Sequence, residues 1–266
     1  MQDLRPEAWQ PLLTTRSLGR GVVIVEHTLS STNTVLKNSA RNGTISGGLC
    51  LCEQQTAGRG RLDRSWSSPE GQGIWMSALL QPSLPPENAP LLTFCAALAM
   101  TQAIRKLTGL DARIKWPNDV ILQGRKVCGV LLEAGFAPDG NLFVVIGTGL
   151  NVHPDAYPPE LADRAVSLAE CCTPPSRSEL IAGYLNALEE AIGAIESRGF
   201  SGISKPYHEF SCTLGKEVQV LSPTETFTGV ALDVDDTGAL LVRTADGNTR
   251  RVLAGDVSVR GMMGYV

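Results

Sequence analysis

Three arginines lie close together in a glycine-rich stretch in the first third of the chain. From Gln55 to Gly73 the sequence reads QTAGRGRLDRSWSSPEGQG, a stretch that we call the arginine loop, and only two acidic residues offset its Arg59, Arg61 and Arg64. Glycine makes a backbone costly to order, and neighbouring like charges repel one another. Guanidinium groups bind phosphate and carboxylate oxygens with paired hydrogen bonds. The stretch therefore predicts an anion-binding loop, with a solvated flexible loop as the alternative.

A second polar cluster lies in the segment KWPNDVILQGRKVCGVLLE, at positions 115–133. Pro117 favours an extended conformation of the residue before it and fixes the chain just before Asn118 and Asp119. Their amide and carboxylate groups suit a ribose or a Mg²⁺ ion. An Asn-Asp pair is by itself more typical of a turn. The combination with the basic residues that follow favours a binding site.

A hairpin is expected within this segment, with its turn at 124–126. Lys126 would reach back from that turn over the sheet as a point charge, although a hairpin lysine is more often solvated. A third cluster, GTGLN at 147–151, is expected at the end of a strand. Gly147 and Gly149 would leave room there beside Asn151. Sites tend to be built at such strand ends and turns.

Composition and missing motifs exclude several classes of protein. The chain has 266 residues, 43% of them hydrophobic and 19% charged, as in an ordinary globular protein. A net charge of −4 argues against bulk nucleic-acid binding. The first twenty residues lack the apolar core of a signal peptide, and no run of about 18 apolar residues could cross a membrane. We therefore expect a cytoplasmic protein. Neither a P-loop nor the Gly-x-Ser-x-Gly or His-Glu-x-x-His motif occurs.

The cysteines and histidines do not predict a metal site. The seven cysteines are odd in number and include no Cys-x-x-Cys pair. Free thiols, mostly buried, are the expected state. The three histidines are scattered along the chain, so no zinc site is predicted.

Hydrophobic patterns predict a mixed α/β part followed by a small β part. Strands are expected at 21–28, 48–55, 74–82, 113–116, 120–123, 127–136 and 142–152, the first and last of them buried. Helices are expected from a cap at Ser30 or Ser31 to Gly43, at 86–109, at 176–197 and at 205–211. From about residue 212, short apolar runs alternate with turns at 236–238 and 246–248. The expected domains are therefore 1–211 and 212–266.

The three clusters, in this order, resemble the biotin–protein ligases, also called biotin–[acetyl-CoA-carboxylase] ligases. GRGRLDRSW, KWPNDV, GRKVCGVLLE and GTGLNV carry the resemblance, together with LSSTN upstream and GDVSVRG at 255–261. The resemblance implies an α+β fold, in which a mixed β-sheet with flanking helices precedes a small C-terminal SH3-like all-β barrel. Bifunctional members carry an N-terminal winged helix-turn-helix that represses biotin genes. About twenty residues precede the resemblance here, so we expect a monofunctional ligase without a nucleic-acid or membrane partner.

The resemblance also implies a two-step, AMP-forming reaction. The carboxylate of biotin attacks the α-phosphorus of ATP, giving biotinyl-5′-AMP and pyrophosphate. The biotinyl group then passes to one lysine of the biotin carboxyl carrier protein of acetyl-CoA carboxylase or a similar carboxylase. Mg²⁺ would accompany ATP. The base for the acceptor lysine, the role of the C-terminal part and the oligomeric state, a homodimer included, stay open.

Site residues follow from the resemblance position by position. The expected biotin-binding residues are Ser31, Thr32, Asn33, Gln55, Gly58, Arg59, Gly60, Arg61, Lys126 and Gly129. The expected ATP-binding residues are Arg59, Arg61, Arg64, Trp66, Asn118, Asp119, Lys126 and Asn151, with Trp66 stacking on adenine. Lys126 and Arg61 would be catalytic, and Asp119 and Asn151 would offer oxygen ligands to Mg²⁺.

Three alternatives are weighed against this interpretation. A lipoate or octanoate ligase of the same fold would need a long apolar tunnel, whereas Ser31, Thr32 and Asn33 with Gln55 suit the ureido ring of biotin. A biotin-sensing DNA-binding regulator would need a basic helix-turn-helix. A non-catalytic biotin binder would not need three arginines in one loop.

Overall fold

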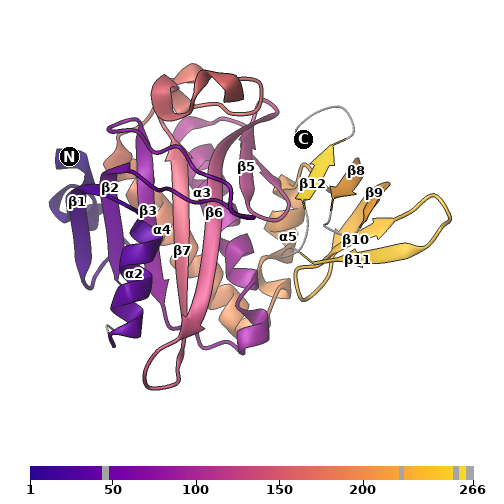
Figure 1. Cartoon of the computed structure of the whole chain (residues 1–266), viewed down its shortest axis with the longest axis horizontal. Coiled ribbons are helices and arrows are strands. Elements are labelled where there is room, and N and C mark those ends of the chain that lie inside the picture. Colours follow the sequence, from indigo (N-terminus) through magenta and orange to yellow (C-terminus); the bar gives the residue numbers. More distant parts are fainter. Residues whose placement is uncertain (44–47, 222–224, 254–257, 262–266) are drawn as a thin grey trace.

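The computed structural model describes residues 1–43, 48–221, 225–253 and 258–261. Its larger part is a mixed sheet of seven strands flanked by helices, and a smaller antiparallel sheet of five strands follows towards the C-terminus (Figure 1). The predicted α+β fold with a small all-β part is confirmed. The described strands of the smaller sheet form an open order, so its closure into a barrel stays a prediction.

The large sheet has the strand order β1-β2-β3-β7-β6-β5-β4. Its strands are β1 (Val23–Leu29), β2 (Leu49–Gln55), β3 (Gly73–Leu80), β4 (Arg113–Lys115), β5 (Asp119–Leu122), β6 (Arg125–Phe136) and β7 (Leu142–Asn151). β1 and β2 are parallel, and all other neighbours are antiparallel. The strand predicted at 21–28 is present as β1, but the prediction that it is buried is wrong, because β1 lies at the sheet edge and its residues are half-buried or exposed.

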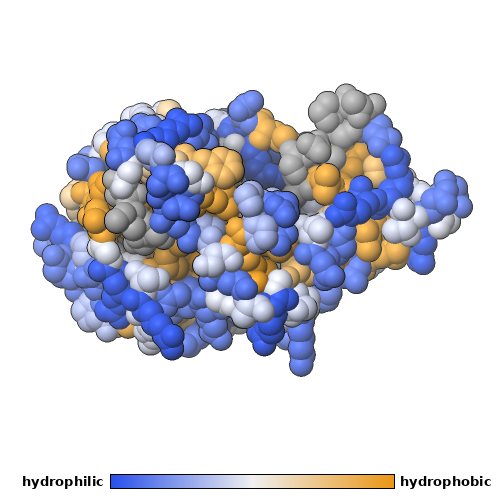
Figure 2. All heavy atoms as spheres, turned by 90° about the horizontal axis from the view of Figure 1, so that it is seen from below, coloured by the Kyte–Doolittle hydropathy of each residue, from blue (hydrophilic) through white to orange (hydrophobic). Residues whose placement is uncertain are grey.

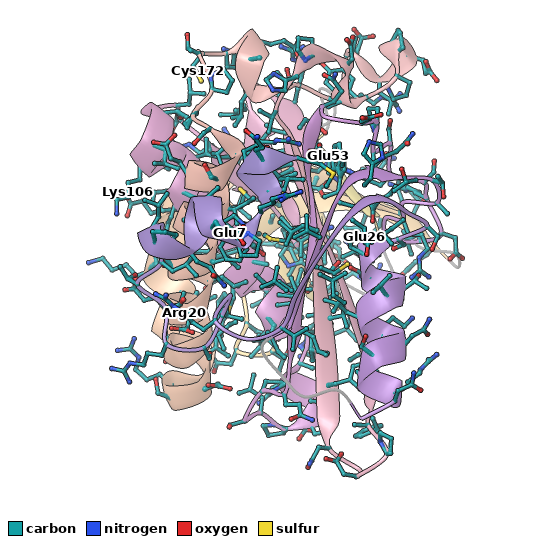
Figure 3. The ribbon with its side chains drawn as sticks, turned by 90° about the vertical axis from the view of Figure 1, so that its left-hand side faces the viewer. Glu7, Arg20, Glu26, Glu53, Lys106 and Cys172 are labelled. Atoms are coloured by element: carbon teal, nitrogen blue, oxygen red, sulfur yellow. The ribbon has the colours of Figure 1, made fainter. Side chains whose placement is uncertain are left out.

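Helices cover both faces of this sheet (Figure 3). The α-helices are α1 (Pro6–Trp9), α2 (Thr32–Arg41), α3 (Leu91–Thr108), α4 (Arg177–Arg198) and α5 (Ser201–Phe210). Short 3-10 helices are η1 (Gln2–Leu4), η2 (Gln10–Leu12), η3 (Pro86–Asn88), η4 (Pro154–Ala156), η5 (Pro159–Leu161) and η6 (Leu168–Glu170). α3 lies between the sheet and α4, which explains why most of its residues are apolar. α2 packs on the opposite face, where Leu36 and Ala40 meet Cys50 and Val145.

Local sequence explains where these helices begin and end. Ser176 and Glu179 form a capping box at the start of α4. Gly109 ends α3 in the left-handed conformation, with a φ of 73°. Ser31 occupies the N-cap position of α2 as predicted, but its side chain makes no capping hydrogen bond.

The hairpin between β5 and β6 differs from its prediction. The two turn residues are Gln123 and Gly124, with φ angles of 50° and 76°. Two successive positive φ angles are typical of a tight hairpin turn. Arg125 and Lys126, which were expected in the turn, belong to β6 instead. Strand pairing therefore fixes the backbone of Lys126. Likewise, Gly147 and Gly149 lie inside β7 and not at its end.

The small sheet has the order β11-β10-β9-β8-β12. Its strands are β8 (Glu217–Leu221), β9 (Thr226–Val234), β10 (Leu240–Arg243), β11 (Thr249–Val252) and β12 (Ser258–Gly261). The predicted turns are present, with Gly238 and Gly247 at φ angles of 86° and 85°. Trp116 of the larger part donates its indole N–H to the carbonyl of Gly238 at 3.1 Å. The domain boundary at 212 stays a prediction, and residues 255–257 of GDVSVRG lie outside the described residues.

A buried ionic cluster joins the first residues to the sheet. Glu53 on β2 is 3% exposed, and both its carboxylate oxygens accept from Arg177 of α4, at 2.7 and 3.0 Å (Figure 3 labels Glu53). Arg177 also binds the carboxylate of Asp3, and the N-terminal ammonium of Met1 contacts Glu53. The cluster ties η1 to α4 and β2.

The surface is mixed in hydropathy, and the cysteines of the chain form no disulfide. Hydrophilic residues and smaller apolar areas alternate on the face seen in Figure 2. None of the helices in the described ranges has both the length and the apolar character of a membrane span. All seven cysteines are free. Four are buried as expected, while Cys171, Cys172 and Cys212 are half-buried.

Candidate functional site

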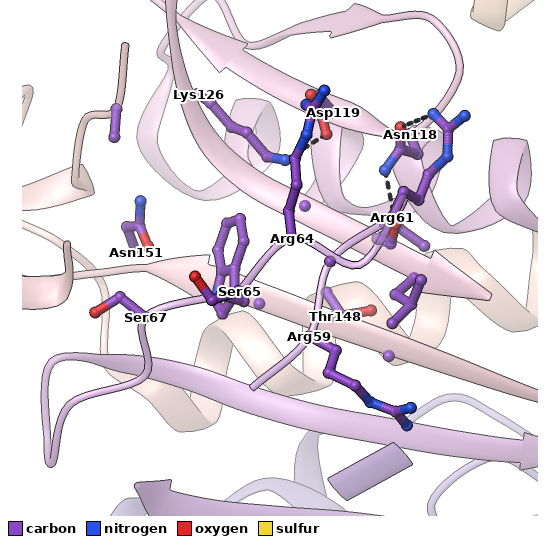
Figure 4. A pocket seen from close by; sticks show the side chains of 18 of the residues that line it. Arg59, Arg61, Arg64, Ser65, Ser67, Asn118, Asp119, Lys126, Thr148 and Asn151 are labelled. Carbon is purple, nitrogen blue, oxygen red and sulfur yellow. Dashed lines mark hydrogen bonds and ion pairs between the residues drawn. The ribbon is translucent and has the colours of Figure 1, made fainter. Parts of the chain in front are cut away.

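A pocket of about 920 Å³ opens beside the first turn of α2 (Figure 4). The start of α2, the arginine loop, strands β5 to β7 and a segment after β7 line it. Nearly all the predicted site residues are among its lining: Ser31, Thr32, Asn33, Gln55, Arg59, Gly60, Arg61, Arg64, Trp66, Asn118, Asp119, Lys126, Gly129 and Asn151. Gly58 is the exception. A Cβ added there would meet the carbonyl oxygen of Trp66 at 2.4 Å, so Gly58 allows the loop backbone to close on itself.

At the α2 end of the pocket, short polar side chains form a connected network. The Oε1 atom of Gln55 accepts from the backbone N–H of Thr32 at 2.9 Å, so Gln55 supplies the helix cap that Ser31 does not. The other end of the same amide donates to Ser68 at 2.9 Å. Ser77, on β3, lies 2.7 Å from the hydroxyl of Thr32. Ser77 is fully buried, and it was not among the predicted site residues.

Asn33 is held in one orientation by its neighbours. Its Oδ1 lies 2.5 Å from the hydroxyl of Ser77, and its Nδ2 donates to the carboxylate of Glu133 at 2.9 Å. The side chain also fills the space above Gly147, because a Cβ at that glycine would come within 2.2 Å of Oδ1. Gly147 is therefore needed for the close approach of Asn33 to the sheet.

The arginine loop between β2 and β3 is folded by its own backbone. Arg59 pairs with Ser65, and the N–H of Gly60 donates to the carbonyl of Arg64 at 2.7 Å. Leu62 and Asp63 at the tip have φ angles of 56° and 54°. The loop is thus a small hairpin at the rim of the pocket, not a solvated coil.

The three arginines of the loop point in different directions (Figure 4). Arg61 donates to the Oδ1 of Asn118 at 2.9 Å, and Asn118 in turn donates to the carbonyl of Val130 at 2.7 Å. Arg59 reaches Glu133 at 3.1 Å. Arg64 is largely exposed at the rim. The loop thereby brings positive charge to separate points around one opening.

Lys126 and Asp119 form an ion pair in the middle of the pocket, with Nζ and Oδ1 2.6 Å apart. The lysine nitrogen lies 4.9 Å from the centre of the Trp66 ring. That ring packs against Gly129 and Gly149. A Cβ added at Gly129 would lie 2.9 Å from the ring, and one added at Gly149 would lie 2.4 Å from it. The indole nitrogen of Trp66 is buried there without a hydrogen-bond partner among the described residues.

The far wall of the pocket comes from a segment after β7 that was not predicted to form part of a site. Tyr157, Leu161, Asp163, Arg164 and Ala165 contribute to the lining. The segment is attached to β6, because the backbone of Lys126 donates to the carbonyl of Arg164 at 2.7 Å and accepts from Val166 at 3.0 Å. Asn151 also donates to the carbonyl of Val166, at 3.2 Å. Proline-rich 3-10 turns gave no periodic pattern from which this wall could be predicted.

The two predicted Mg²⁺ ligands lie on strands separated by β6. Asp119 begins β5 and Asn151 ends β7, so Lys126 lies on the strand between them. Two strand spacings of about 4.8 Å separate their backbones across the sheet. The part of the chain that the structure describes contains no cluster of three or more acidic, histidine or cysteine side chains able to hold a metal.

The pocket therefore has a graded chemistry. Neutral donors and acceptors lie at the α2 end, cationic groups of Lys126 and Arg61 in the middle, and Trp66 with Asn151 towards the far wall. An elongated ligand with a polar uncharged head and an anionic centre fits this order. A carboxylic acid joined to a phosphate is one such ligand.

Comparison with known proteins agrees with this chemistry. Residues 25–151 match the biotin/lipoate A/B protein ligase family, and residues 213–260 match the biotin protein ligase C-terminal domain. The bifunctional ligase/repressor BirA of Bacillus subtilis is 35% identical over 240 residues, which cover 89% of this chain and 74% of the relative. A biotin–[acetyl-CoA-carboxylase] ligase of Mycobacterium tuberculosis is 32% identical over 96% of both chains.

Solved structures give the same result. The biotin protein ligase of Aquifex aeolicus in complex with biotin and ATP superposes with a TM-score of 0.79 at 30% identity, covering 90% of this chain and 99% of that one. Sequence and structure thus agree over both parts of the molecule. The chain belongs to the biotin/lipoate A/B protein ligase family, and within it to the biotin protein ligases.

Proposed function

We propose that this protein activates biotin with ATP and transfers the biotinyl group to a lysine of a carboxylase carrier domain. One observation carries the proposal: Lys126 and the three arginines of the arginine loop line one pocket, whose α2 end consists of short polar side chains. Neutral polar groups suit the ureido ring, and the cations suit a carboxylate next to phosphates. The lipoate alternative loses support, because the α2 end is a hydrogen-bonded network rather than an apolar tunnel.

In this proposal the network around α2 recognises the ureido ring. Thr32 and Asn33 are held by Gln55 and Ser77, so their free donor and acceptor positions are fixed before biotin arrives. Preorganised groups lose little conformational entropy on binding. Biotin would then lie along β7 with its carboxylate near Lys126.

The first step needs alignment and charge neutralisation. A carboxylic acid is ionised at neutral pH, so attack on the α-phosphorus needs no general base. Lys126 would bind the attacking carboxylate and an α-phosphate oxygen, and Arg61 the opposite side of the same centre. The negative charge that builds on the phosphorus oxygens is stabilised by these cations. Pyrophosphate leaves with the electron pair of the broken phosphorus–oxygen bond.

The nucleotide would occupy the end of the pocket near β7 and the far wall. Trp66 offers an apolar face for adenine, while Arg64, Asn118 and Asn151 offer polar contacts. Mg²⁺ would arrive with ATP and supply charge neutralisation to its phosphates. Because Mg²⁺ commonly keeps several waters and takes one or two protein oxygens, Asp119 and Asn151 fit as separate contacts to the ATP–Mg²⁺ unit better than as ligands of one directly bound ion.

The second step transfers the biotinyl group to the carrier. The lysine amine of the carrier domain attacks the mixed anhydride, and AMP leaves. That amine has an ordinary pKa of about 10.4 and has to lose a proton. The closed arginine loop would shield the adenylate from water until the carrier docks.

ATP–pyrophosphate exchange tests this proposal. Biotin, lipoate and octanoate are each added with Mg²⁺ to the folded protein. Exchange that depends on biotin alone is expected. Exchange with lipoate would change the substrate while keeping the chemistry, and no exchange with any acid would leave a protein that binds without catalysis. Mass spectrometry of a carrier domain after incubation then reports the transfer step.

A further inference from the structure

Glu133 lies on β6 outside the pocket lining, yet its carboxylate contacts the site from behind. Its Oε2 accepts from the Nδ2 of Asn33 at 2.9 Å and from the guanidinium of Arg59 at 3.1 Å. Its Oε1 lies 2.6 Å from the Nζ of Lys37. One carboxylate thus joins α2, β6 and the arginine loop.

The environment keeps this carboxylate ionised. Its side chain is 18% exposed. Burial raises the pKa of Glu133. Hydrogen bonds from Lys37 and Asn33 and the charge of Arg59 lower it by more, so the pKa lies below its usual range. An ionised carboxylate can accept hydrogen bonds but not donate them.

This property fixes the direction of the Asn33 amide. Because Glu133 only accepts, the Nδ2 of Asn33 has to face it, and a second Nδ2 hydrogen bond reaches the carbonyl of Leu131 at 3.3 Å. The Oδ1 is thereby turned to Ser77 and lies against Gly147, and both Asn33 and Gly147 line the pocket. In the proposed function this amide oxygen would accept from an N–H of the ureido ring.

The Oε2 atom of Glu133 also holds the arginine loop. The guanidinium of Arg59 donates to Glu133 and also to the hydroxyl of Thr34 at 3.2 Å. These two contacts connect the arginine loop to β6 and α2. Among its three arginines, Arg59 is the one placed to anchor the loop at the α2 end of the pocket.

We propose that Glu133 is a positioning residue that couples the resting position of the arginine loop to the orientation of the biotin-recognising carboxamide. The coupling arises because Asn33 and Arg59 share one carboxylate oxygen. Its effect on biotin rests on the proposed function, whereas its hold on the loop does not. Without the carboxylate, the loop loses its anchor and the amide of Asn33 is free to turn over.

The first test uses trypsin on the protein without substrates, because the loop carries three arginine cleavage sites. Glu133→Gln keeps the shape of the side chain and removes its charge. Loop cleavage should become about tenfold faster, since a charge-assisted hydrogen bond is worth roughly one such factor or more. Asp111→Asn, which removes an exposed carboxylate paired with Arg105 and Arg113, is the matched control and should cleave like wild type.

The second test separates binding from catalysis in biotin-dependent exchange. Glu133→Gln should raise the KM for biotin about tenfold and leave kcat within about twofold. The interaction that is lost prepares the site for biotin binding and does not change during the chemical step. A purely structural role would lower the active fraction, and hence kcat, at an unchanged KM. Circular dichroism confirms the fold of each variant.

Arg59→Lys is a second variant. The side chain of Arg59 is 45% exposed, so its replacement should leave the fold intact. Lysine keeps the charge and the trypsin site but lacks the forked donor group that spans Glu133 and Thr34. Its loop should also be cleaved faster. Wild-type cleavage in both variants, or an unchanged KM in Glu133→Gln, would overturn the proposal. A wild-type protein without biotin exchange would instead refute the ligase function, and trypsin would still decide the role of Glu133.

Discussion

The Nζ atom of Lys126 lies 2.6 Å from the Oδ1 of Asp119, on two neighbouring strands whose pairing fixes both backbones. The side chains are 21% and 14% exposed. The lysine charge is therefore already balanced before a substrate enters. An incoming carboxylate and phosphate would share this lysine with Asp119, which makes Lys126 the residue on which the first step depends most.

Replacement of Lys126 by methionine should abolish most of the exchange activity. We expect a loss of about 10²-fold to 10³-fold in kcat, the usual effect of removing one preorganised group that stabilises developing charge. Lys106→Met, on the exposed side of α3, is the control and should keep full activity. Exchange above a third of the wild-type rate in Lys126→Met would show that another group carries this charge.

Arg61→Ala should release biotinyl-5′-AMP into solution. Arg61 is tied to Asn118 across the pocket at 2.9 Å, and its loss removes that contact and one cation from the pocket. The adenylate should form but leave faster than in wild type, as measured by free biotinyl-AMP per enzyme in the absence of carrier. Arg41→Ala, exposed at the end of α2, serves as control. Release no faster than wild type would contradict the shielding role of the loop.

Gly149→Ala should displace Trp66 and weaken nucleotide binding. A Cβ at this position would lie 2.4 Å from the indole nitrogen, too close to be tolerated without movement of the ring. The KM for ATP should rise and the tryptophan fluorescence should change. Gly193→Ala in α4 meets nothing within 4 Å, and it should instead stabilise the protein by up to about 1 kcal/mol. An unchanged KM for ATP would place adenine away from Trp66.

Glu53→Gln should destabilise the fold. The substitution removes the charge that faces the buried guanidinium of Arg177, and breaking a buried ion pair from one side costs about 3 kcal/mol or more. Urea unfolding measures the loss in the free energy of unfolding. Glu26→Gln, exposed on β1, should change it by less than about 0.5 kcal/mol. A small effect in Glu53→Gln would mean that Asp3 alone satisfies Arg177.

Acid should weaken the C-terminal sheet through Asp235. Burial raises the pKa of this carboxyl, but hydrogen bonds from Arg251, Thr237 and the backbone lower it to about 2. Because the folded-state pKa is below the unfolded value of 3.8, the stabilisation is complete above about pH 4 and is lost as the pH falls towards 2. The difference in unfolding free energy between wild type and Asp235→Asn should shrink over this range. A constant difference would exclude this linkage.

Much of the large sheet could be predicted because most of its strands are distinct apolar runs between turn residues. The site residues could be named because they occur in short motifs, and the pocket brings all of them except Gly58 into its lining. The prediction that Lys126 lies in the hairpin turn is wrong, because the turn falls at Gln123 and Gly124 and Lys126 lies on β6. Gln123 adopts a positive φ, which glutamine rarely does, so its residue type did not indicate a turn.

The supporting residues could not be predicted in the same way. Ser77 and Glu133 lie within strand patterns, and their roles arise from contacts with Asn33 of α2, which packs on the sheet. The far wall likewise depends on backbone hydrogen bonds between β6 and Val166, which involve no particular side-chain type. Such contacts between distant parts of the chain leave no local signal in sequence.

The pairing of β3 with β7 has a consequence for how the protein folds. Gly73 is the partner of Asn151 in that ladder, so the middle of the sheet closes only when chain positions nearly eighty residues apart have met. Contacts of such long sequence separation slow folding. The hairpins between β4 and β6 can form early and locally. The floor of the pocket, however, appears only with this late closure, so a nascent chain that has not yet emerged through β7 should be unable to bind either substrate.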